Sequence, residues 1–241
     1  MDTAYCGLKK IDMTYDADFD PQQSVTKALY EEVPDAHELS VIIPPWHANE
    51  WLLKRIAGQQ RKLGRSTLMY LFDDNILSSD AERTLTSFVV IAGRIETDLH
   101  DKKAEAVHWF ATSLGTSVLM HTLGSKKLLA TTIDFVVPGG DLAKSLWTGL
   151  RTRPLREQFE AQGITLSQLQ KLWIPLAPTV QAAKIHDTDI TMSISLADQI
   201  IRPDTAFEFA NALRESGNRV TIHTNSHLGH YGTILASGFS G

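Results

Sequence analysis

Short apolar runs separated by turn residues recur along the chain. Val41 to Ile43 is an apolar, β-branched run that ends at Pro44-Pro45. Runs of this kind between turn signals are typical of buried strands. We expect further strands at residues 67–72, 106–112, 127–137, 189–196 and 220–224, with a weaker strand pattern from Leu8 to Tyr15.

Amphipathic stretches follow most of these runs. Leu52, Ile56 and Leu63 share one helical face, which predicts a helix after the first run. Ser79 and Glu82 have the spacing of a capping box, and apolar residues recur at helical spacing behind them. We expect further helices at residues 114–123, from Pro203 to the residues before Gly217, and after Gly229.

Strands that alternate with helices predict the α/β class, with a mainly parallel central sheet and helices on both faces. Residues 141–185 interrupt this alternation, because they contain several helical pieces broken at prolines and a glycine. We interpret residues 1–241 as a single domain and residues 141–185 as a small helical cap inserted into it.

Composition and charge exclude several classes of protein. The 241 residues carry a formal net charge of −5, whereas a nucleic-acid-binding domain is usually basic. Cys6 is the single cysteine, so the chain cannot form an intramolecular disulfide. The N-terminus lacks the pattern of a signal peptide, and no stretch reaches the length of a transmembrane helix. We therefore expect a cytoplasmic protein that binds neither nucleic acid nor membrane.

The segment Ala111-Thr112-Ser113-Leu114-Gly115 lies at a predicted strand-to-helix junction. It is similar to the nucleophile elbow, G-x-S-x-G, with alanine at the first position. Small residues suit a sharp turn that exposes the serine oxygen beside the N-terminus of a helix. The alternative is a serine at an ordinary helix N-cap.

Acidic and imidazole side chains follow two later strands. Asp198 follows the run that ends near Leu196, and such a carboxylate can orient a histidine. Asp204 competes with it, but its place at a helix start favours a structural role. After the last strand, His230 is the best candidate for a general base, since His223 lies in the strand itself.

The histidine spacing also permits a metal site. His223, His227 and His230 offer three imidazoles, which suits a catalytic zinc ion. The sequence disfavours this alternative, because the first lies in a strand and the others in a loop, and no H-E-x-x-H helix or cysteine cluster is present. We expect neither a metal nor another cofactor.

The order Ser113, Asp198, His230 resembles the chain order of the α/β-hydrolase family of serine hydrolases. The resemblance implies that these residues form a catalytic triad. It also implies an oxyanion hole made by the backbone N–H groups of Leu114 and Trp46. The usual His-Gly of that second loop is replaced by Pro44-Pro45, and proline has no N–H to donate, so the second donor must be Trp46 or His47.

The implied activity is hydrolysis of a small carboxylic ester or a related acyl compound through an acyl-enzyme on Ser113. Trp147, Leu150 and Trp173 are candidates for the lining of an apolar substrate pocket, with the core of the cap as their alternative role. The sequence fixes neither the bond that is cleaved nor the oligomeric state.

Two other functions compete with this one. The missing His-Gly motivates a non-catalytic binding protein with the same fold. A nucleotide-binding Rossmann enzyme has the same alternation of strands and helices but needs a glycine-rich turn after its first strand. Here prolines follow that strand, and Pro138-Gly139-Gly140 comes too late.

Overall fold

A computed structural model describes residues 19–237 of the chain. Cys6 and the strand predicted from Leu8 to Tyr15 lie outside the described residues.

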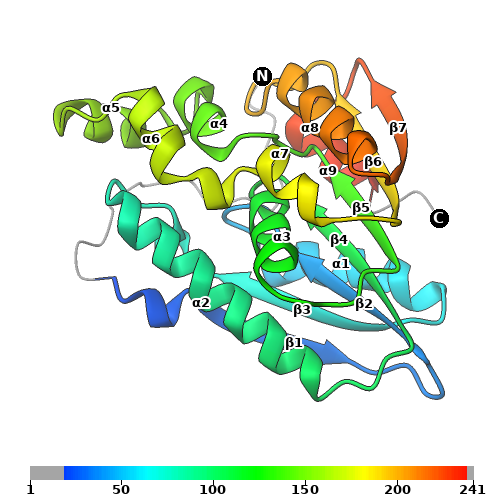
Figure 1. The fold of residues 1–241 in the computed structure, drawn as a ribbon. Coiled ribbons are helices and arrows are strands. Elements are labelled where there is room, and N and C mark those ends of the chain that lie inside the picture. The colour runs from blue at the N-terminus through cyan, green and yellow to red at the C-terminus, as the bar shows by residue number, and fades with distance from the viewer. Residues whose placement is uncertain (1–18, 238–241) are drawn as a thin grey trace, which may run out of the picture.

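Within the described residues, the fold is built on one seven-stranded sheet (Figure 1). The strands lie in the order β1-β3-β2-β4-β5-β6-β7. All neighbouring pairs are parallel except β1 and β3, which are antiparallel. The strands are β1 (Val25–Glu31), β2 (Glu38–Ile43), β3 (Ser66–Phe72), β4 (Ala106–Thr112), β5 (Thr132–Val136), β6 (Asp189–Ser195) and β7 (Arg219–Asn225).

Helices cover both faces of the sheet, as the sequence predicted. One face carries α2, α3, α7 and α8, which pack side by side, and the other carries α1 and α9 (Figure 1). The helices are α1 (Glu50–Lys62), α2 (Ala81–His100), α3 (Leu114–Ser125), α4 (Leu142–Thr148), α5 (Arg153–Ala161), α6 (Leu166–Leu172), α7 (Pro178–Gln181), α8 (Pro203–Glu215) and α9 (His230–Ser237). Short 3₁₀ helices occur at Pro21–Gln23, Asp74–Ile76, Ile174–Leu176 and Ala182–Lys184.

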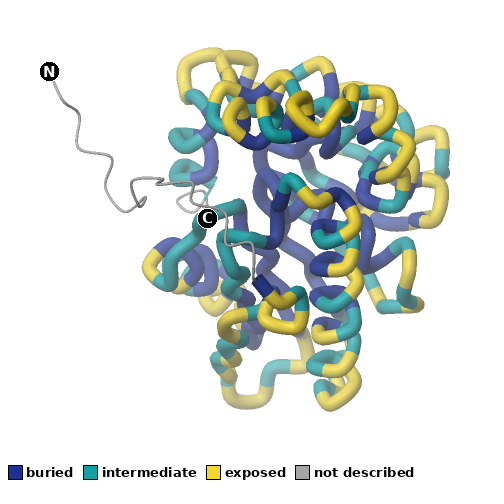
Figure 2. Tube along the Cα trace, turned by 90° about the vertical axis from the view of Figure 1, so that its left-hand side faces the viewer, coloured by how far each residue is buried: buried dark blue, intermediate teal, exposed yellow. Residues whose placement is uncertain are grey.

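The core is split into two layers by the sheet. The larger layer lies under α2, α3 and α8, where Trp109, Phe135 and Phe209 are at most 1% exposed. The smaller layer joins α1 and α9 to the other face through Ile42 and Met69. Figure 2 shows that the buried segments lie in the interior of the molecule, whereas the exposed segments lie at its periphery. Helix α3 is buried along most of its length, so the turn before it is held rigidly.

Strand β1 is an element that the sequence pattern did not predict. It pairs with only one neighbour, at the edge of the sheet, and its side chains are exposed or half-buried. Lys27 forms an ion pair with Glu50 there at 2.5 Å. An edge strand with charged residues lacks the apolar run by which a central strand is recognised.

Two predicted boundaries are wrong. The N-cap of α2 is Asp80, whose carboxylate accepts from the N–H groups of Glu82 and Arg83, so Ser79 and Glu82 do not form the predicted capping box. Strand β5 begins at Thr132, five residues later than predicted. Caps and strand ends depend on hydrogen bonds that apolar periodicity does not reveal.

Between β5 and β6 the chain forms the run of helices expected for residues 141–185. Helix α4 packs against α5 and α6, and α6 packs against α2, whereas α7 packs between α3 and α8 on the sheet face. We call α4–α6 the helical insertion. None of the helices in the described part of the chain is both long and apolar enough to cross a membrane.

Candidate active site

The three residues proposed for the triad each follow the carboxyl end of a parallel strand. Ser113 follows β4, Asp198 follows β6, and His230 begins α9 after β7. Because parallel strands end at a common edge, residues that are far apart in sequence meet there. The structure brings all three side chains together at this edge.

Ser113 occupies a strained turn between β4 and α3. Its backbone has φ 53° and ψ −118°, a conformation that residues with a Cβ rarely adopt. Its N–H donates to the carbonyl of Val136 in β5, which holds the turn against the neighbouring strand. Strain of this kind costs of order 1–3 kcal/mol and persists only where the surroundings enforce it. The sequence A-T-S-L-G therefore forms a sharp strand-to-helix elbow.

Gly115 explains why a small residue is needed after the elbow. A Cβ at this position would lie 2.5 Å from the carbonyl oxygen of Ile43 and 2.7 Å from that of Pro44. Both contacts are to backbone atoms, which cannot swing aside as the end of a side chain can. Glycine thus allows the loop after β2 to lie directly against the first turn of α3.

A continuous hydrogen-bonded relay links the three side chains. The Nε2 atom of His230 lies 3.0 Å from the hydroxyl oxygen of Ser113, and its Nδ1 lies 2.6 Å from Oδ2 of Asp198. The residues are 5–9% exposed, so little water competes for these bonds. A carboxylate only accepts, so Nδ1 carries the proton and Nε2 is left to accept from the hydroxyl. This tautomer is the one that a general base requires.

Asp198 is fixed by backbone donors on its other oxygen. Its Oδ1 accepts from the N–H groups of Ile200 and Ile201 at 2.8 and 2.9 Å. These bonds satisfy a carboxylate that is otherwise out of contact with water. The side chain is therefore oriented before any substrate binds.

The loop that carries His230 is tied to β6 and β7. The Ser195 hydroxyl donates to the carbonyl of Leu228, and the N–H of Leu228 donates to the side chain of Asn225 at 3.1 Å. The Asn225 amide also donates to the hydroxyl of Thr233 in α9 at 3.1 Å. These contacts set the position of the imidazole.

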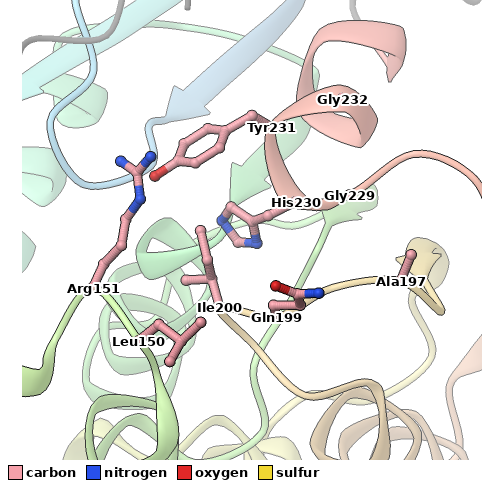
Figure 3. Close-up of a pocket in the computed structure, with 9 residues that line it drawn as sticks. All are labelled: Leu150, Arg151, Ala197, Gln199, Ile200, Gly229, His230, Tyr231 and Gly232. Atoms are coloured by element: carbon pink, nitrogen blue, oxygen red, sulfur yellow. The ribbon is translucent and has the colours of Figure 1, made fainter. Parts of the chain in front are cut away.

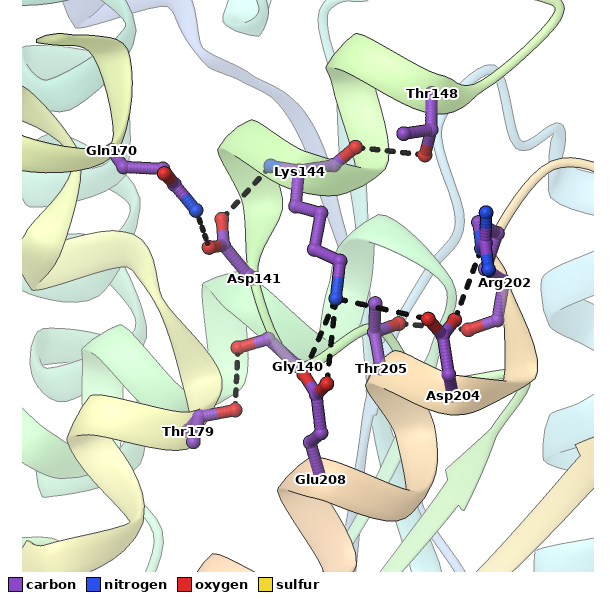
Figure 4. Close-up of polar contacts among 10 residues, drawn as sticks. All are labelled: Gly140, Asp141, Lys144, Thr148, Gln170, Thr179, Arg202, Asp204, Thr205 and Glu208. Carbon is purple, nitrogen blue, oxygen red and sulfur yellow. Dashed lines mark hydrogen bonds and ion pairs between the residues drawn. The ribbon is translucent and has the colours of Figure 1, made fainter. Parts of the chain in front are cut away.

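Asp204, the competing carboxylate, lies elsewhere (Figure 4). It accepts from Arg202 at 3.2 Å, and the ammonium of Lys144 lies 3.8 Å away. Burial raises the pKa of the Asp204 carboxyl, but the hydrogen bond and charge of Arg202, with the charge of Lys144, outweigh this and lower it. Lys144 also contacts Glu208, so the cluster links α4 to α8 rather than serving His230.

The loop after β2 is anchored by Asp74. The indole N–H of Trp46 donates to the backbone carbonyl of Asp74 at 2.8 Å, and Nδ1 of His47 lies 2.9 Å from the Asp74 carboxylate. The two aromatic rings stack with their centroids 4.2 Å apart. Within residues 19–237, the backbone N–H groups of Trp46 and Leu114 donate to no protein acceptor. Trp46 lies in the loop after β2 and Leu114 begins α3. Gly115 allows these two segments, which contain the candidate oxyanion donors, to lie against each other.

A cavity of about 470 Å³ lies beside the His230 imidazole (Figure 3). Leu150, one of the candidates for a substrate-pocket lining, lines it and is 70% exposed. Apolar side chains of Leu150 and Ile200 occupy one part of it, and the polar groups of Arg151 and Gln199 occupy others. Sequence reasoning missed Arg151 and Tyr231, although each directly follows a residue that it singled out, Leu150 and His230.

Trp147 and Trp173, the other two candidates for the pocket lining, are not among the residues that line this cavity. Trp147 is partly buried and packs against the main core. Trp173 is 1% exposed, packs edge-to-face on Phe159 and donates its indole N–H to the carbonyl of Ala81 at 3.0 Å. The alternative role in the core is therefore the one the structure shows for Trp173. A large aromatic residue in an amphipathic pattern has the same signature in either place.

No group of three or more histidine, cysteine, aspartate or glutamate side chains in residues 19–237 is arranged to hold a metal ion. His230, the last of the three spaced histidines, is engaged by Ser113 and Asp198. The arrangement can instead remove a proton from a hydroxyl and return it.

No protein-family model and no curated protein matches the sequence. Solved structures do match the fold. Acetyl xylan esterase from Paenibacillus sp. R4 is 12% identical with a TM-score of 0.66, over 87% of this chain and 75% of its own. Est1E from Butyrivibrio proteoclasticus is 11% identical with a TM-score of 0.58, over 88% of this chain and 91% of its own.

Acylaminoacyl peptidase from Pyrococcus horikoshii is 14% identical with a TM-score of 0.65. The match covers 88% of this chain but only 37% of the peptidase, so the likeness concerns one part of that protein. With the parallel sheet, the elbow after β4 and the strand-end positions described above, these neighbours identify the architecture. The chain has the α/β-hydrolase fold.

Proposed function

We propose that this protein is a serine hydrolase that cleaves a small carboxylic ester or a related acyl compound through an acyl-enzyme on Ser113. The observation that carries the proposal is the relay from the Ser113 hydroxyl through His230 to Asp198. The similarity in fold to esterases and a peptidase supports it.

In the first step, the Ser113 oxygen forms a bond to the carbonyl carbon while Nε2 of His230 takes the hydroxyl proton. Asp198 stabilises the imidazolium that results. The carbonyl electron pair moves onto oxygen, which we propose accepts hydrogen bonds from the N–H groups of Leu114 and Trp46. Collapse of this intermediate breaks the bond to the leaving group, which takes the proton from His230.

Water then repeats the sequence on the acyl-enzyme. His230 removes a proton from the water molecule, whose oxygen bonds to the acyl carbon. The second collapse breaks the bond to Ser113, and the proton returns to its oxygen. Free acid and free enzyme are the products, so no cofactor is needed.

A fluorophosphonate probe tests this proposal, because it reacts covalently with activated serines. We expect labelling of the folded protein and its loss in Ser113→Ala, with Asp204→Asn as a matched control that labels normally. A panel of 4-nitrophenyl esters of increasing acyl length then reports the preferred acyl group. Absence of labelling in protein shown to be folded by circular dichroism would favour the alternative, a non-catalytic binding protein.

A further inference from the structure

The cavity beside His230 has an uneven chemical lining. It is formed by the loop after α4, the loop after β6 and the start of α9, and its residues are Leu150, Arg151, Ala197, Gln199, Ile200, Gly229, His230, Tyr231 and Gly232. Its volume of about 470 Å³ is in the range of small-molecule sites. Among these lining residues Arg151 is the only lysine, arginine, aspartate or glutamate.

Arg151 is tied to the catalytic imidazole through one aromatic ring. Its guanidinium carbon lies 4.6 Å from the ring centroid of Tyr231, and that ring lies edge-to-face on His230 with centroids 5.3 Å apart. The distance from the guanidinium carbon to the centroid of the imidazole ring therefore cannot exceed the sum of these two distances. Figure 3 shows the Arg151 head group beside the Tyr231 hydroxyl.

The neighbouring arginines differ from Arg151 in their partners. Arg153 forms an ion pair with Glu157 at 2.7 Å, and Arg156 lies 3.7 Å from Glu160. Arg151 is half-buried, yet no carboxylate of the described residues lies within ion-pair distance of it. A half-buried guanidinium without a counter-ion in the described part of the chain can pair with an anionic ligand.

We infer that Arg151 binds an anionic group of the substrate, and that the substrate is an acyl compound with a carboxylate a few bonds from the scissile carbonyl. The inference rests on the proposed hydrolase function. The cation–π contact with the Tyr231 ring does not use the guanidinium N–H groups as hydrogen-bond donors, so its N–H edge can meet a ligand. That edge matches the two oxygens of a carboxylate, which it binds as a fork.

Two pairs of esters test the inference. In the first pair, 4-nitrophenyl hemisuccinate is compared with 4-nitrophenyl 4-methylpentanoate, whose isopropyl group replaces the carboxylate with the same number of heavy atoms. In the second pair, 3-carboxyphenyl acetate is compared with phenyl acetate, which moves the charge to the leaving group. Arg151→Gln removes the charge, Arg151→Lys keeps it without the fork, and Arg153→Gln is the matched control outside the cavity.

We expect Arg151→Gln to lower kcat/KM about 10- to 100-fold for the anionic member of at least one pair, with its neutral partner nearly unchanged. Arg151→Lys should restore part of the loss, and Arg153→Gln should have no selective effect. A structural role for Arg151 would lower both members of each pair equally. That result overturns the inference while leaving the hydrolase function intact.

Binding provides a readout that does not depend on turnover. Calorimetric titration of monomethyl succinate into Ser113→Ala should give a dissociation constant that Arg151→Gln in the same background weakens about 10-fold or more. Unchanged binding, or none to either variant, overturns the inference. If instead the binding is lost with Arg151 but no ester is hydrolysed, the anion site stands and the hydrolase function fails.

Discussion

Asp198 and His230 are joined by a hydrogen bond of 2.6 Å between side chains that are only 3% and 4% exposed. The Asp198 carboxylate also accepts two backbone N–H groups, so it is held in place independently of the imidazole. In this setting the aspartate selects which imidazole nitrogen carries the proton, and this selection can be tested apart from the fold.

Asp198→Asn should lower kcat by about 10⁴-fold, because an amide can donate to Nδ1 and thereby favour the wrong imidazole tautomer. The volume of the side chain is nearly unchanged. Steady-state kinetics with a 4-nitrophenyl ester measures the effect, and Asp204→Asn controls for the loss of a carboxylate near α8. A decrease of less than ten-fold in Asp198→Asn would contradict the proposed role.

Gly115→Ala should destabilise the protein by about 1–3 kcal/mol and reduce activity, because its Cβ would press on the carbonyl oxygens of Ile43 and Pro44. The backbone after β2 must then move, and with it the proposed oxyanion donor Trp46. Urea unfolding and kcat together measure the two effects.

Gly93→Ala is the matched comparison for Gly115→Ala. Gly93 lies inside α2, and no atom lies within 4 Å of where its Cβ would be. The substitution should raise the free energy of unfolding by about 0.5–1 kcal/mol, because alanine favours helix more than glycine does. Equal effects at the two glycines would show that the close approach at Gly115 has no consequence.

The candidate triad could be predicted from sequence because each residue directly follows an apolar strand. In a parallel sheet, the period of strands and helices already fixes which chain positions share an edge. The prediction of this triad therefore required no knowledge of packing. The structure brings the side chains of Ser113, Asp198 and His230 together. The small residues around Ser113 added the local geometry of the elbow.

Other features depend on tertiary contacts, and the sequence did not reveal them. Strand β1 is half-exposed at the sheet edge, so its pattern is not apolar. Trp173 and Leu150 have similar apolar settings in the sequence, yet one is buried and the other is exposed beside the cavity. The environment of Arg151 depends on α9, which is distant in the chain. Periodicity identifies an apolar face but does not say what covers it.

Trp173 and Leu150 should therefore respond differently to substitution. Trp173→Phe removes the indole hydrogen bond to the carbonyl of Ala81 and part of a fully buried ring system, and should cost about 1–3 kcal/mol of stability, with KM unchanged. Leu150→Ala should alter stability by less than about 0.5 kcal/mol, because the side chain is exposed. It should raise KM for esters with apolar acyl groups. Chemical denaturation and kinetics on both variants check this, and a change of KM in Trp173→Phe would contradict the assignment to the core.

His121 should make stability depend on pH in the range below about pH 7. Burial lowers the pKa of its imidazole below the ordinary value of 6.5, and its Nδ1 donates to the carbonyl of Pro175 at 3.1 Å. As the pH falls below 6.5, the imidazole becomes protonated in the unfolded chain while it is still neutral in the folded protein. The free energy of unfolding therefore falls as the pH falls, until the folded imidazole is itself protonated.

His121→Gln removes this titration and should flatten the decrease, as urea unfolding at several pH values in this window would show. His108, whose pKa burial also lowers, contributes in the same direction, so part of the slope remains in the single variant. The free energy of unfolding of His121→Gln could instead fall as steeply with pH as that of the wild-type protein. In that case His121 takes up its proton as readily in the folded protein as in the unfolded chain. Burial of His121 beside Phe88, whose ring centroid lies 6.3 Å from that of the imidazole, would then not keep the imidazole neutral.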